Sequence, residues 1–274
     1  DDWIVMTRNA LVVLKLGGEL LAETSGRRNI AVAIGRLAAG APLVVIHGGG
    51  REIDTEMAAR GITKRAVDGL RLTDAATLDV VVSILAGRIN TQLVAAAKHA
   101  GVRAVGLTAT DAGVASVQRA KPYTTGSGDV VDLGFVGQPT GTTKPELLCR
   151  LCSDGFVPVI TSVGSDDAGQ LLNVNADTLA GHLAVQLKAS RLLIAGGTAG
   201  VLDAEGQTIP AVDKVLLQQL LVDGRASAGM VAKLMACCEA AHGGVARVEI
   251  VDGTQTDDLN RSTGTRVETY EPEA

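Results

Sequence analysis

Short apolar runs recur along the chain and end in glycine or a polar turn. Each run is four to six residues long and apolar at successive positions, so the strand that it predicts has two buried faces. Strands of this kind are typical of a parallel sheet that is covered on both sides. The runs are Leu11–Leu16, Leu43–Ile46, Arg103–Leu107, Val157–Thr161, Leu192–Ala195 and Val248–Val251.

Longer stretches with helical periodicity separate these runs. The alternation predicts an α/β fold in which one mostly parallel sheet has helices on both faces. We expect a single domain over residues 1–274, because no repeat, low-complexity tract or linker interrupts the pattern. The predicted helices are Arg27–Ala39, Glu52–Arg60, Ala75–Ala100, Lys144–Asp154, Ala176–Lys188, Val212–Val222 and Gly229–His242.

The segment Gly113–Gly141 has a different pattern. Glycine, proline and threonine separate short alternating runs there, as in Val130–Gly137 ("VVDLGFVG"). This pattern predicts hairpins that form a flap or an edge of the sheet. The polar end of the chain, Glu268–Ala274, predicts a solvated tail.

Charge and composition narrow the function classes. A formal net charge of −5 and only 2% aromatic residues argue against nucleic-acid binding and base stacking. No apolar run reaches the roughly 20 residues of a membrane span, and no secretory signal is recognisable. We therefore expect a cytoplasmic protein with reduced thiols. Cys149, Cys152, Cys237 and Cys238 lie in apolar helical patterns, which favours core packing over a zinc site.

Two glycine-rich turns follow the first two predicted strands. Lys15 precedes Gly17 and Gly18, and the run His47–Gly50 leads into a helix. Glycine lets a bulky anion approach the backbone, whose N–H groups bind it best at the start of a helix. A lysine adds charge for phosphates. Neither turn has the P-loop or dinucleotide fingerprint. We expect His47 itself to pack at the strand end.

Polar residues also stand at the starts of later helices. Arg71 precedes the long predicted helix, whose cap is Thr73 or Asp74. Its guanidinium could clamp a carboxylate or form a surface salt bridge. Asn173 and Asn175 have the spacing that places two side chains on one side of an extended stretch, where they could bind a ligand.

Charged residues in first helical turns complete the candidates. Asp177 suits the positive end of its helix and could hold lysines in place. Lys233 opens the last predicted helix, where the helix dipole disfavours a cation. A bound phosphate would give this lysine a reason to stand there.

The ordered motifs of the chain resemble those of one enzyme family. They are "KLGG", "HGGG", "GLRLTD", "ILAGRINTQLV", "NVNAD" and "GMVAK", followed by Gly264-Thr265, and they extend from Leu11 to Val267. Each motif is weak alone, but the set in this order resembles the acetylglutamate kinase branch of the amino-acid kinase family. "GLRLTD" and "NVNAD" favour this branch over aspartate, glutamate, carbamate and uridylate kinases.

The resemblance implies a fold and an activity. The fold would be an open αβα sandwich with a central, mainly parallel sheet, as in carbamate kinase. The acceptor, N-acetyl-L-glutamate, would bind in a lobe of about residues 1–150, and ATP in a lobe of about residues 151–274. Magnesium would arrive with ATP, and the protein itself would supply no metal site.

The resemblance also implies roles for individual residues. Lys15 and Lys233 would neutralise charge on the transferring phosphoryl group, and Asp177 would orient both lysines. Arg71 would bind the α-carboxylate of the acceptor, and Asn173 would help to fix the same substrate. The backbone would contribute through glycines: Gly17, Gly18, Gly49 and Gly50 at the acceptor and the phosphoryl group, and Gly196, Gly197 and Gly200 at the nucleotide.

The chain departs from the family at one point and leaves alternatives open. Relatives have a Thr/Ser-Asp pair where this chain has Gly196-Gly197, so the nucleotide site could be altered or the protein could be a silent sensor of an amino acid or nucleotide. Another N-acylated acid, such as N-succinylglutamate or an acylated or carrier-bound aminoadipate, is a further alternative. Tyr123–Asp132 is expected to cover that pocket. The short chain ends predict a homodimer that is insensitive to arginine.

Overall fold

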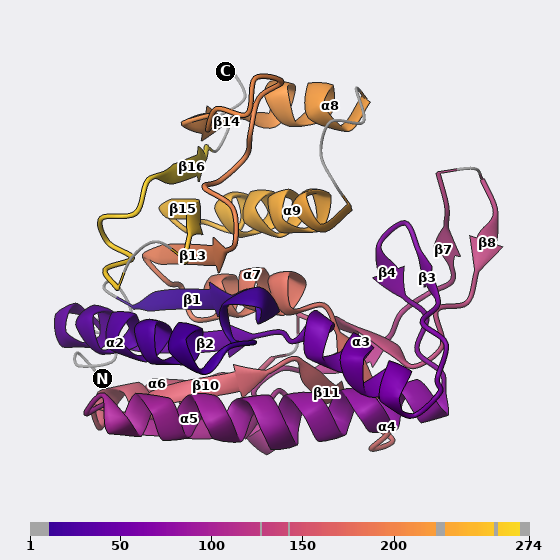
Figure 1. Ribbon diagram of the computed structural model, residues 1–274, viewed down its shortest axis with the longest axis horizontal. Coiled ribbons are helices and arrows are strands. Elements are labelled where there is room, and N and C mark those ends of the chain that lie inside the picture. Colours follow the sequence, from indigo (N-terminus) through magenta and orange to yellow (C-terminus); the bar gives the residue numbers. More distant parts are fainter. Residues whose placement is uncertain (1–10, 127, 142, 223–227, 255–256, 269–274) are drawn as a thin grey trace.

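An eight-stranded sheet forms the centre of the molecule (Figure 1). The computed structural model describes residues 11–126, 128–141, 143–222, 228–254 and 257–268. Neighbouring strands are parallel except β15 and β16, which are antiparallel. The strands lie in the order β14 (Ala211–Val212), β16 (Gly264–Val267), β15 (Arg247–Asp252), β13 (Arg191–Gly196), β1 (Val12–Leu16), β2 (Leu43–His47), β10 (Val157–Thr161) and β5 (Ala104–Thr108).

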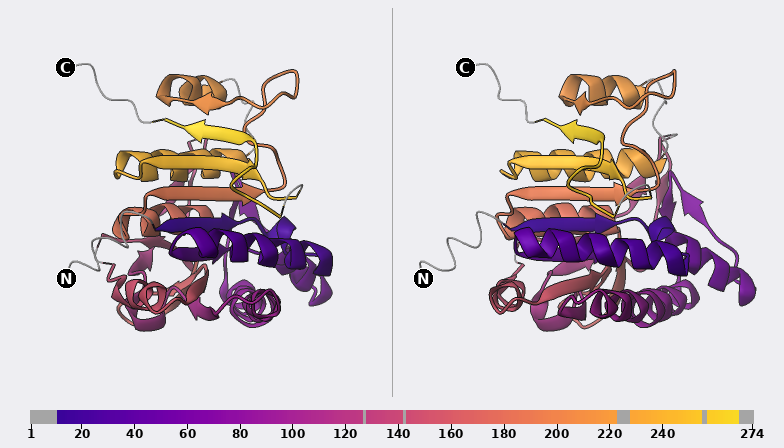
Figure 2. Two further views of the ribbon diagram at one scale, coloured as in Figure 1. Left: turned by 90° about the vertical axis from the view of Figure 1, so that its left-hand side faces the viewer. Right: turned by 60° about the vertical axis from the view of Figure 1, so that its left-hand side comes forward.

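Helices cover both faces of this sheet, so the predicted three-layer αβα sandwich is confirmed (Figures 1 and 2). One layer contains α2 (Thr24–Gly40), α3 (Gly50–Ala59), α4 (Ala75–Val82) and α5 (Asn90–His99). The opposite layer contains α6 (Glu146–Ser153), α7 (Ala176–Gln186), α8 (Lys214–Val222) and α9 (Ala228–His242). All six predicted strands belong to the sheet, and Figure 2 shows β13, β15 and β16 stacked beside one another.

The alternation of side chains along each strand builds the two cores. In β1, Val13 packs with the layer of α7 and α9, whereas Leu14 packs with the layer of α2 and α5. Both side chains are fully buried. Successive residues of a strand point to opposite faces, so a strand between two helical layers must be apolar throughout. This requirement explains why the apolar runs located the strands.

The long helix predicted over Ala75–Ala100 forms in three consecutive parts. A π-helical segment, η2 (Ser83–Ile89), joins α4 to α5. By length and composition the run Ala75–His99 could cross a membrane, contrary to the expectation from the sequence. Only 44% of its most apolar window is buried, but Leu78, Leu85 and Leu93 lie in the core.

Smaller sheets project from the carboxyl ends of the central strands. A four-stranded sheet contains β11 (Val163–Ser165), β12 (Leu171–Val174), β9 (Val136–Pro139) and β6 (Val117–Arg119). Two hairpins stand beside it: β3 (Ala66–Val67) with β4 (Leu70–Arg71), and β7 (Tyr123–Thr124) with β8 (Val130–Val131). The predicted hairpins within Gly113–Gly141 are confirmed by the antiparallel pairs β6–β9 and β7–β8. The predicted tail lies largely outside the described residues.

The cysteines occupy helices, as predicted. Cys152 of α6 and Cys237 of α9 are buried in the core, and Cys149 and Cys238 pack against it. Burial raises the pKa of the Cys152 thiol to about 12, so this thiol remains protonated and unreactive.

Candidate active site

A cleft of about 300 Å³ opens where the parallel strands end. The carboxyl ends of such strands are where open α/β sheets bind their ligands. The lining combines two glycine turns, cationic side chains and the start of α7. It includes Lys15, Gly17, Gly18, Glu19, Gly48, Gly49, Gly50, Lys64, Arg71, Ser162, Asn173, Asn175 and Asp177.

Two lysines share one carboxylate at this cleft. Lys15, at the end of β1, places its Nζ 2.7 Å from Asp177 Oδ1. Lys233, in the second turn of α9, places its Nζ 4.0 Å from Asp177 Oδ2. Lys15 and Asp177 are almost fully buried, and Lys233 is partly exposed. A single buried carboxylate thus positions two cations that come from opposite ends of the chain.

The two glycine turns face each other across the cleft. A Cβ at Gly18 would lie 2.8 Å from Gly49 Cα and 3.2 Å from the amide nitrogens of Gly49 and Gly50. A Cβ at Gly17 would lie 2.5 Å from Glu19 Oε2. A side chain at Gly18 would therefore fill the space between the turns, and one at Gly17 would overlap the Glu19 carboxylate. Gly18 and Gly50 begin helices, so their N–H groups have no intrahelical acceptor and can bind an anion.

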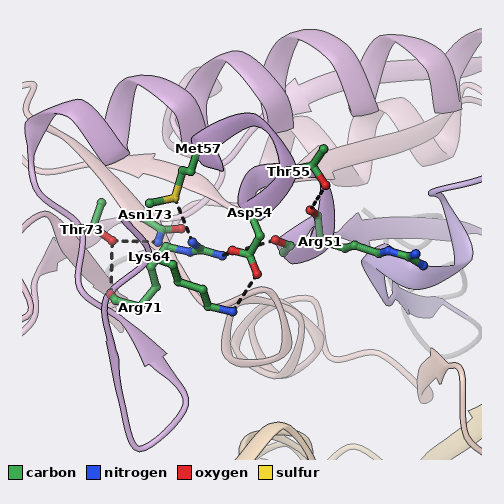
Figure 3. A network of polar contacts seen from close by, with 9 residues as sticks. Arg51, Asp54, Thr55, Met57, Lys64, Arg71, Thr73 and Asn173 are labelled. Atoms are coloured by element: carbon green, nitrogen blue, oxygen red, sulfur yellow. Dashed lines mark hydrogen bonds and ion pairs between the residues drawn. The ribbon is translucent and has the colours of Figure 1, made fainter. Parts of the chain in front are cut away.

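The far end of the cleft carries Arg71, which an aspartate of α3 holds (Figure 3). Its Nη2 forms a short ion pair with Asp54 and donates to Gly50 O at 3.3 Å, and its Nη1 lies 3.1 Å from Met57 Sδ. Lys64 Nζ pairs with the other oxygen of Asp54 at 2.7 Å. Burial raises the pKa of Asp54, but the hydrogen bonds from Lys64 and Arg71 outweigh it and lower the pKa. Both cations therefore meet an ionised carboxylate.

The two asparagines have separate tasks. Asn173 lies on β12 beside Arg71 in Figure 3 and donates from Nδ2 to Thr73 Oγ1 at 3.1 Å. Asn175 Oδ1 instead accepts hydrogen bonds from the N–H groups of Asp177 and Thr178, so Asn175 caps α7. Of the two helix caps proposed for α4, Asp74 is the one observed, because it accepts a hydrogen bond from Thr77 N.

The carboxylate of Glu19 fills the space beside the Gly196–Gly197 turn. Its Oε1 accepts a hydrogen bond from Gly197 N at 2.9 Å, and a Cβ at Gly196 would lie 3.2 Å from the same oxygen and 3.7 Å from Lys233 Cε. Gly196 and Gly197 therefore adjoin the lysine cluster. None of the three predicted nucleotide glycines, Gly196, Gly197 and Gly200, is among the residues that line the cleft. A Cβ at Gly200 would lie 2.8 Å from Thr265 N, so this glycine packs against β16.

Sequence reasoning missed three charged residues of the site. Asp54 lies on α3, Lys64 lies just before β3, and Glu19 follows the first glycine turn. Glu19 directly follows the "KLGG" motif, and this position was the available signal. Asp54 and Lys64 gave no such signal, because charged residues at a helix surface and in a turn are ordinary.

The segment Tyr123–Asp132 was expected to cover the pocket of the acyl group, and its described residues are not among those that line the cleft. Tyr123 Oη and Gly126 N instead donate to Asp68 Oδ2 at 3.1 and 3.0 Å. Asp68 lies in the turn of the β3–β4 hairpin, whose Ala66, Leu70 and Arg71 do line the cleft. The β7–β8 hairpin therefore supports the wall of the site.

Comparison with known proteins places the chain among phosphotransferases. The amino acid kinase family profile matches residues 10–252. The acetylglutamate kinase of Oleidesulfovibrio alaskensis is 37% identical over 246 residues, which are 88% of this chain and 83% of that protein.

Solved structures agree with the fold. The crystal structure of smu.665 from Streptococcus mutans superposes with a TM-score of 0.79 at 25% identity, over 94% of this chain and 98% of that one. The carbamate kinase of Giardia has a TM-score of 0.65 at 18% identity, over 95% of this chain and 99% of that one, which shows a shared fold.

Proposed function

The chain belongs to the amino acid kinase family, in its acetylglutamate kinase branch, and we propose that it transfers the γ-phosphoryl group of ATP to the side-chain carboxylate of N-acetyl-L-glutamate. The observation that carries this proposal is the pair Lys15 and Lys233 on one carboxylate, Asp177, between two glycine turns. We further propose that this reaction serves arginine biosynthesis.

The reaction needs charge neutralisation more than proton transfer. The acceptor carboxylate is already ionised at pH 7, so no general base is required. The barrier lies in bringing one anion against another, and catalysis then consists of alignment and electrostatic stabilisation. Two lysines and free glycine amides supply both, which explains a site without a Ser–His pair or paired carboxylates.

The residues of the cleft suggest where each substrate would bind. The reacting carboxylate would lie between the glycine turns near Lys15, and the α-carboxylate would reach Arg71 and Asn173 at the far end. Asp54 and Lys64 fix the approach to Arg71. The nucleotide would lie on the side of Gly196, Gly197 and Lys233, and its phosphates would displace Glu19 from Gly197 N.

The donor set suits a metal that arrives with the nucleotide. Within the described residues no group of three or more His, Cys, Asp or Glu side chains could hold a metal ion. The glycine turns admit phosphates, because a Cβ at Gly18 would fill the space between them. Bound as Mg²⁺–ATP, the metal would neutralise phosphate charge, and the lysines would neutralise the rest.

The test is ATP-dependent ADP release by purified protein with magnesium. The acceptors are N-acetylglutamate, N-succinylglutamate, N-acetylaminoadipate and free glutamate. We expect turnover with N-acetylglutamate and none with free glutamate. Turnover with a different N-acylated acid alone would support the kinase activity but show that N-acetylglutamate is not the substrate.

A silent sensor predicts a different result. It would bind an amino acid derivative or a nucleotide, measured by calorimetry, without releasing ADP from any mixture. That outcome would refute the kinase proposal and point to Gly197 as the reason. We also retain the predictions of a homodimer in the cytoplasm, and sedimentation equilibrium would test the oligomeric state.

A further inference from the structure

The turn between β2 and α3 contains two backbone N–H groups that point toward the cleft. In the part of the chain that the structure describes, the N–H groups of Gly49 and Gly50 donate to no acceptor, and both nitrogens face Gly18 across the cleft. A turn of three glycines has many accessible conformations. Something outside the turn must therefore hold these amides in one orientation.

The ring of His47 contacts this turn at the carbonyl group of Gly48. His47 is fully buried, and its Nδ1 lies 3.1 Å from Gly48 O. That oxygen and Gly49 N belong to the same trans peptide, whose C=O and N–H point in opposite directions. A hydrogen bond from Nδ1 that holds the carbonyl away from the cleft thus holds the Gly49 N–H toward it.

Asn90 determines which ring nitrogen carries the proton. Its Nδ2 lies 2.9 Å from Val159 O and 3.1 Å from His47 Nε2. The Val159 carbonyl can only accept, so the amide nitrogen of Asn90 must face it. The same nitrogen donates to His47 Nε2, which must then be unprotonated, and the proton of the neutral ring lies on Nδ1. Burial lowers the pKa of His47 to about 4, which agrees with a neutral ring.

The π-helical segment η2 brings Asn90 and two apolar residues to the turn. Asn90 is buried and directly follows η2. A Cβ at Gly106 would overlap Asn90 Oδ1, so a glycine of β5 makes room for this amide. Leu85 and Ile89 of η2 close the back of Gly49, where a Cβ would lie 2.8 Å from Leu85 Cδ2. The segment "ILAGRIN" therefore supports the β2–α3 turn.

We propose that His47 is a positioning residue: with its tautomer set by Asn90, it holds the Gly48 carbonyl so that the Gly49 N–H points at the transferring phosphoryl group. The assignment of that target rests on the proposed function. The hydrogen-bond chain from Val159 through Asn90 and His47 to Gly48 does not.

The first experiment is independent of activity. Two-bond ¹H–¹⁵N correlation spectra of the labelled protein separate protonated from unprotonated ring nitrogens. The chain has 4 histidines, and His47→Asn identifies the signals of His47 by their loss. We expect a neutral ring with the proton on Nδ1 at pH 7. A proton on Nε2, or a doubly protonated ring, would overturn the proposal even if no acceptor supported turnover.

The second experiment measures turnover. His47→Leu removes the hydrogen bond and should lower kcat by roughly 10- to 100-fold, less than the loss of a whole transition-state donor, with little change in KM. His47→Asn can place an amide N–H near the position of Nδ1 and should recover most of kcat. His182→Leu is the matched control, because this half-buried ring bonds Thr143 Oγ1 at 2.7 Å outside the cleft lining.

The comparison separates positioning from folding. If His47→Leu and His182→Leu lose melting temperature equally but only the former loses kcat, the positioning role is supported. Wild-type kcat in a folded His47→Leu protein would refute it. If His47→Leu does not fold, Asn90→Leu tests the same hydrogen-bond chain, and it should move the His47 proton between ring nitrogens and lower kcat.

Discussion

At the scale of single residues, Asp177 concentrates the electrostatics of the site. It is buried, and it holds Lys15 at 2.7 Å and Lys233 at 4.0 Å. A buried carboxylate that loses its cation is strongly destabilising, so the cluster has a structural effect as well as a chemical one. A test of the lysines must therefore separate turnover from folding.

Lys15→Met should abolish most turnover while the acceptor still binds. The change keeps the apolar stem and removes the charge that faces the phosphoryl group, so we expect kcat to fall by about 1,000-fold. Calorimetry with N-acetylglutamate and thermal unfolding provide the two readouts. Lys98→Met, an exposed lysine in the last turn of α5, is the control. Loss of acceptor binding together with turnover would contradict this role.

His47 should make the folded state sensitive to acid. Its pKa is about 4 in the folded protein against an ordinary value of 6.5 for histidine, so the unfolded chain binds more protons between these values. The contribution of His47 to the free energy of unfolding is then fully present above pH 6.5. It decreases by about 3 kcal/mol as the pH falls to about 4, because each pKa unit corresponds to about 1.4 kcal/mol. Urea unfolding of wild type and His47→Asn between pH 7 and pH 4.5 measures the difference. An equal acid dependence in both proteins would contradict this assignment.

The site residues that the sequence predicted share one physical reason. Lys15 lies at the end of β1, Gly49 follows β2, and Asp177 lies in the first turn of α7. The fold of a parallel sheet brings such positions to one edge. Asp54, Lys64 and Glu19 could not be found this way, because their importance depends on a neighbour that is distant in the sequence. Asn175 was predicted to be able to bind a ligand, but its side-chain oxygen caps α7.

At the scale of elements, η2 shows what periodicity cannot detect. The residues Ala75–Ala100 have one continuous apolar pattern, which predicted a single helix. The π-helical turn within it changes the register, and it is this change that directs Leu85, Ile89 and Asn90 toward the β2–α3 turn. A shift of one residue in register leaves almost no trace in an apolar sequence.

Gly49→Ala and Gly87→Ala should have opposite effects on stability. A methyl group at Gly49 would overlap Ile89 Cδ1 in a packed core, and such overpacking costs about 1–3 kcal/mol. At Gly87 in η2 a Cβ meets nothing within 4 Å, so alanine should raise stability by about 0.5–1 kcal/mol. Thermal unfolding of both variants measures this. Equal stabilities would show that the turn can move away from η2.

At the scale of the whole molecule, the central sheet interleaves the two halves of the sequence. β10 lies between β2 and β5, and β13 pairs with β1. The division into an acceptor lobe of about residues 1–150 and a nucleotide lobe of about residues 151–274 remains a functional prediction. The strands β1, β2, β10 and β13 were predictable because both faces are buried. The edge strand β5 is only partly buried and was found by its apolar run, whereas β14 and β16 lie at or near the other edge and lack such a run.

The shared sheet predicts a single cooperative unfolding transition. Calorimetry should give one peak whose calorimetric and van't Hoff enthalpies agree. A fragment of residues 1–150 lacks the strand that separates β2 from β5 and should remain unfolded alone, by circular dichroism. Two resolved transitions, or a folded fragment, would show that the lobes are independent.

The distance along the chain between Lys15 and Lys233 has a consequence for synthesis in the cell. Lys15 leaves the ribosome well before Asp177, and Lys233 emerges last of the three. Until then Lys15 has no counter-charge, and β1 lacks its neighbour β13. A transcript truncated before the codon for Lys233 therefore yields a product that can hold neither the complete charge cluster nor a finished sheet, and it should be a target for proteolytic quality control.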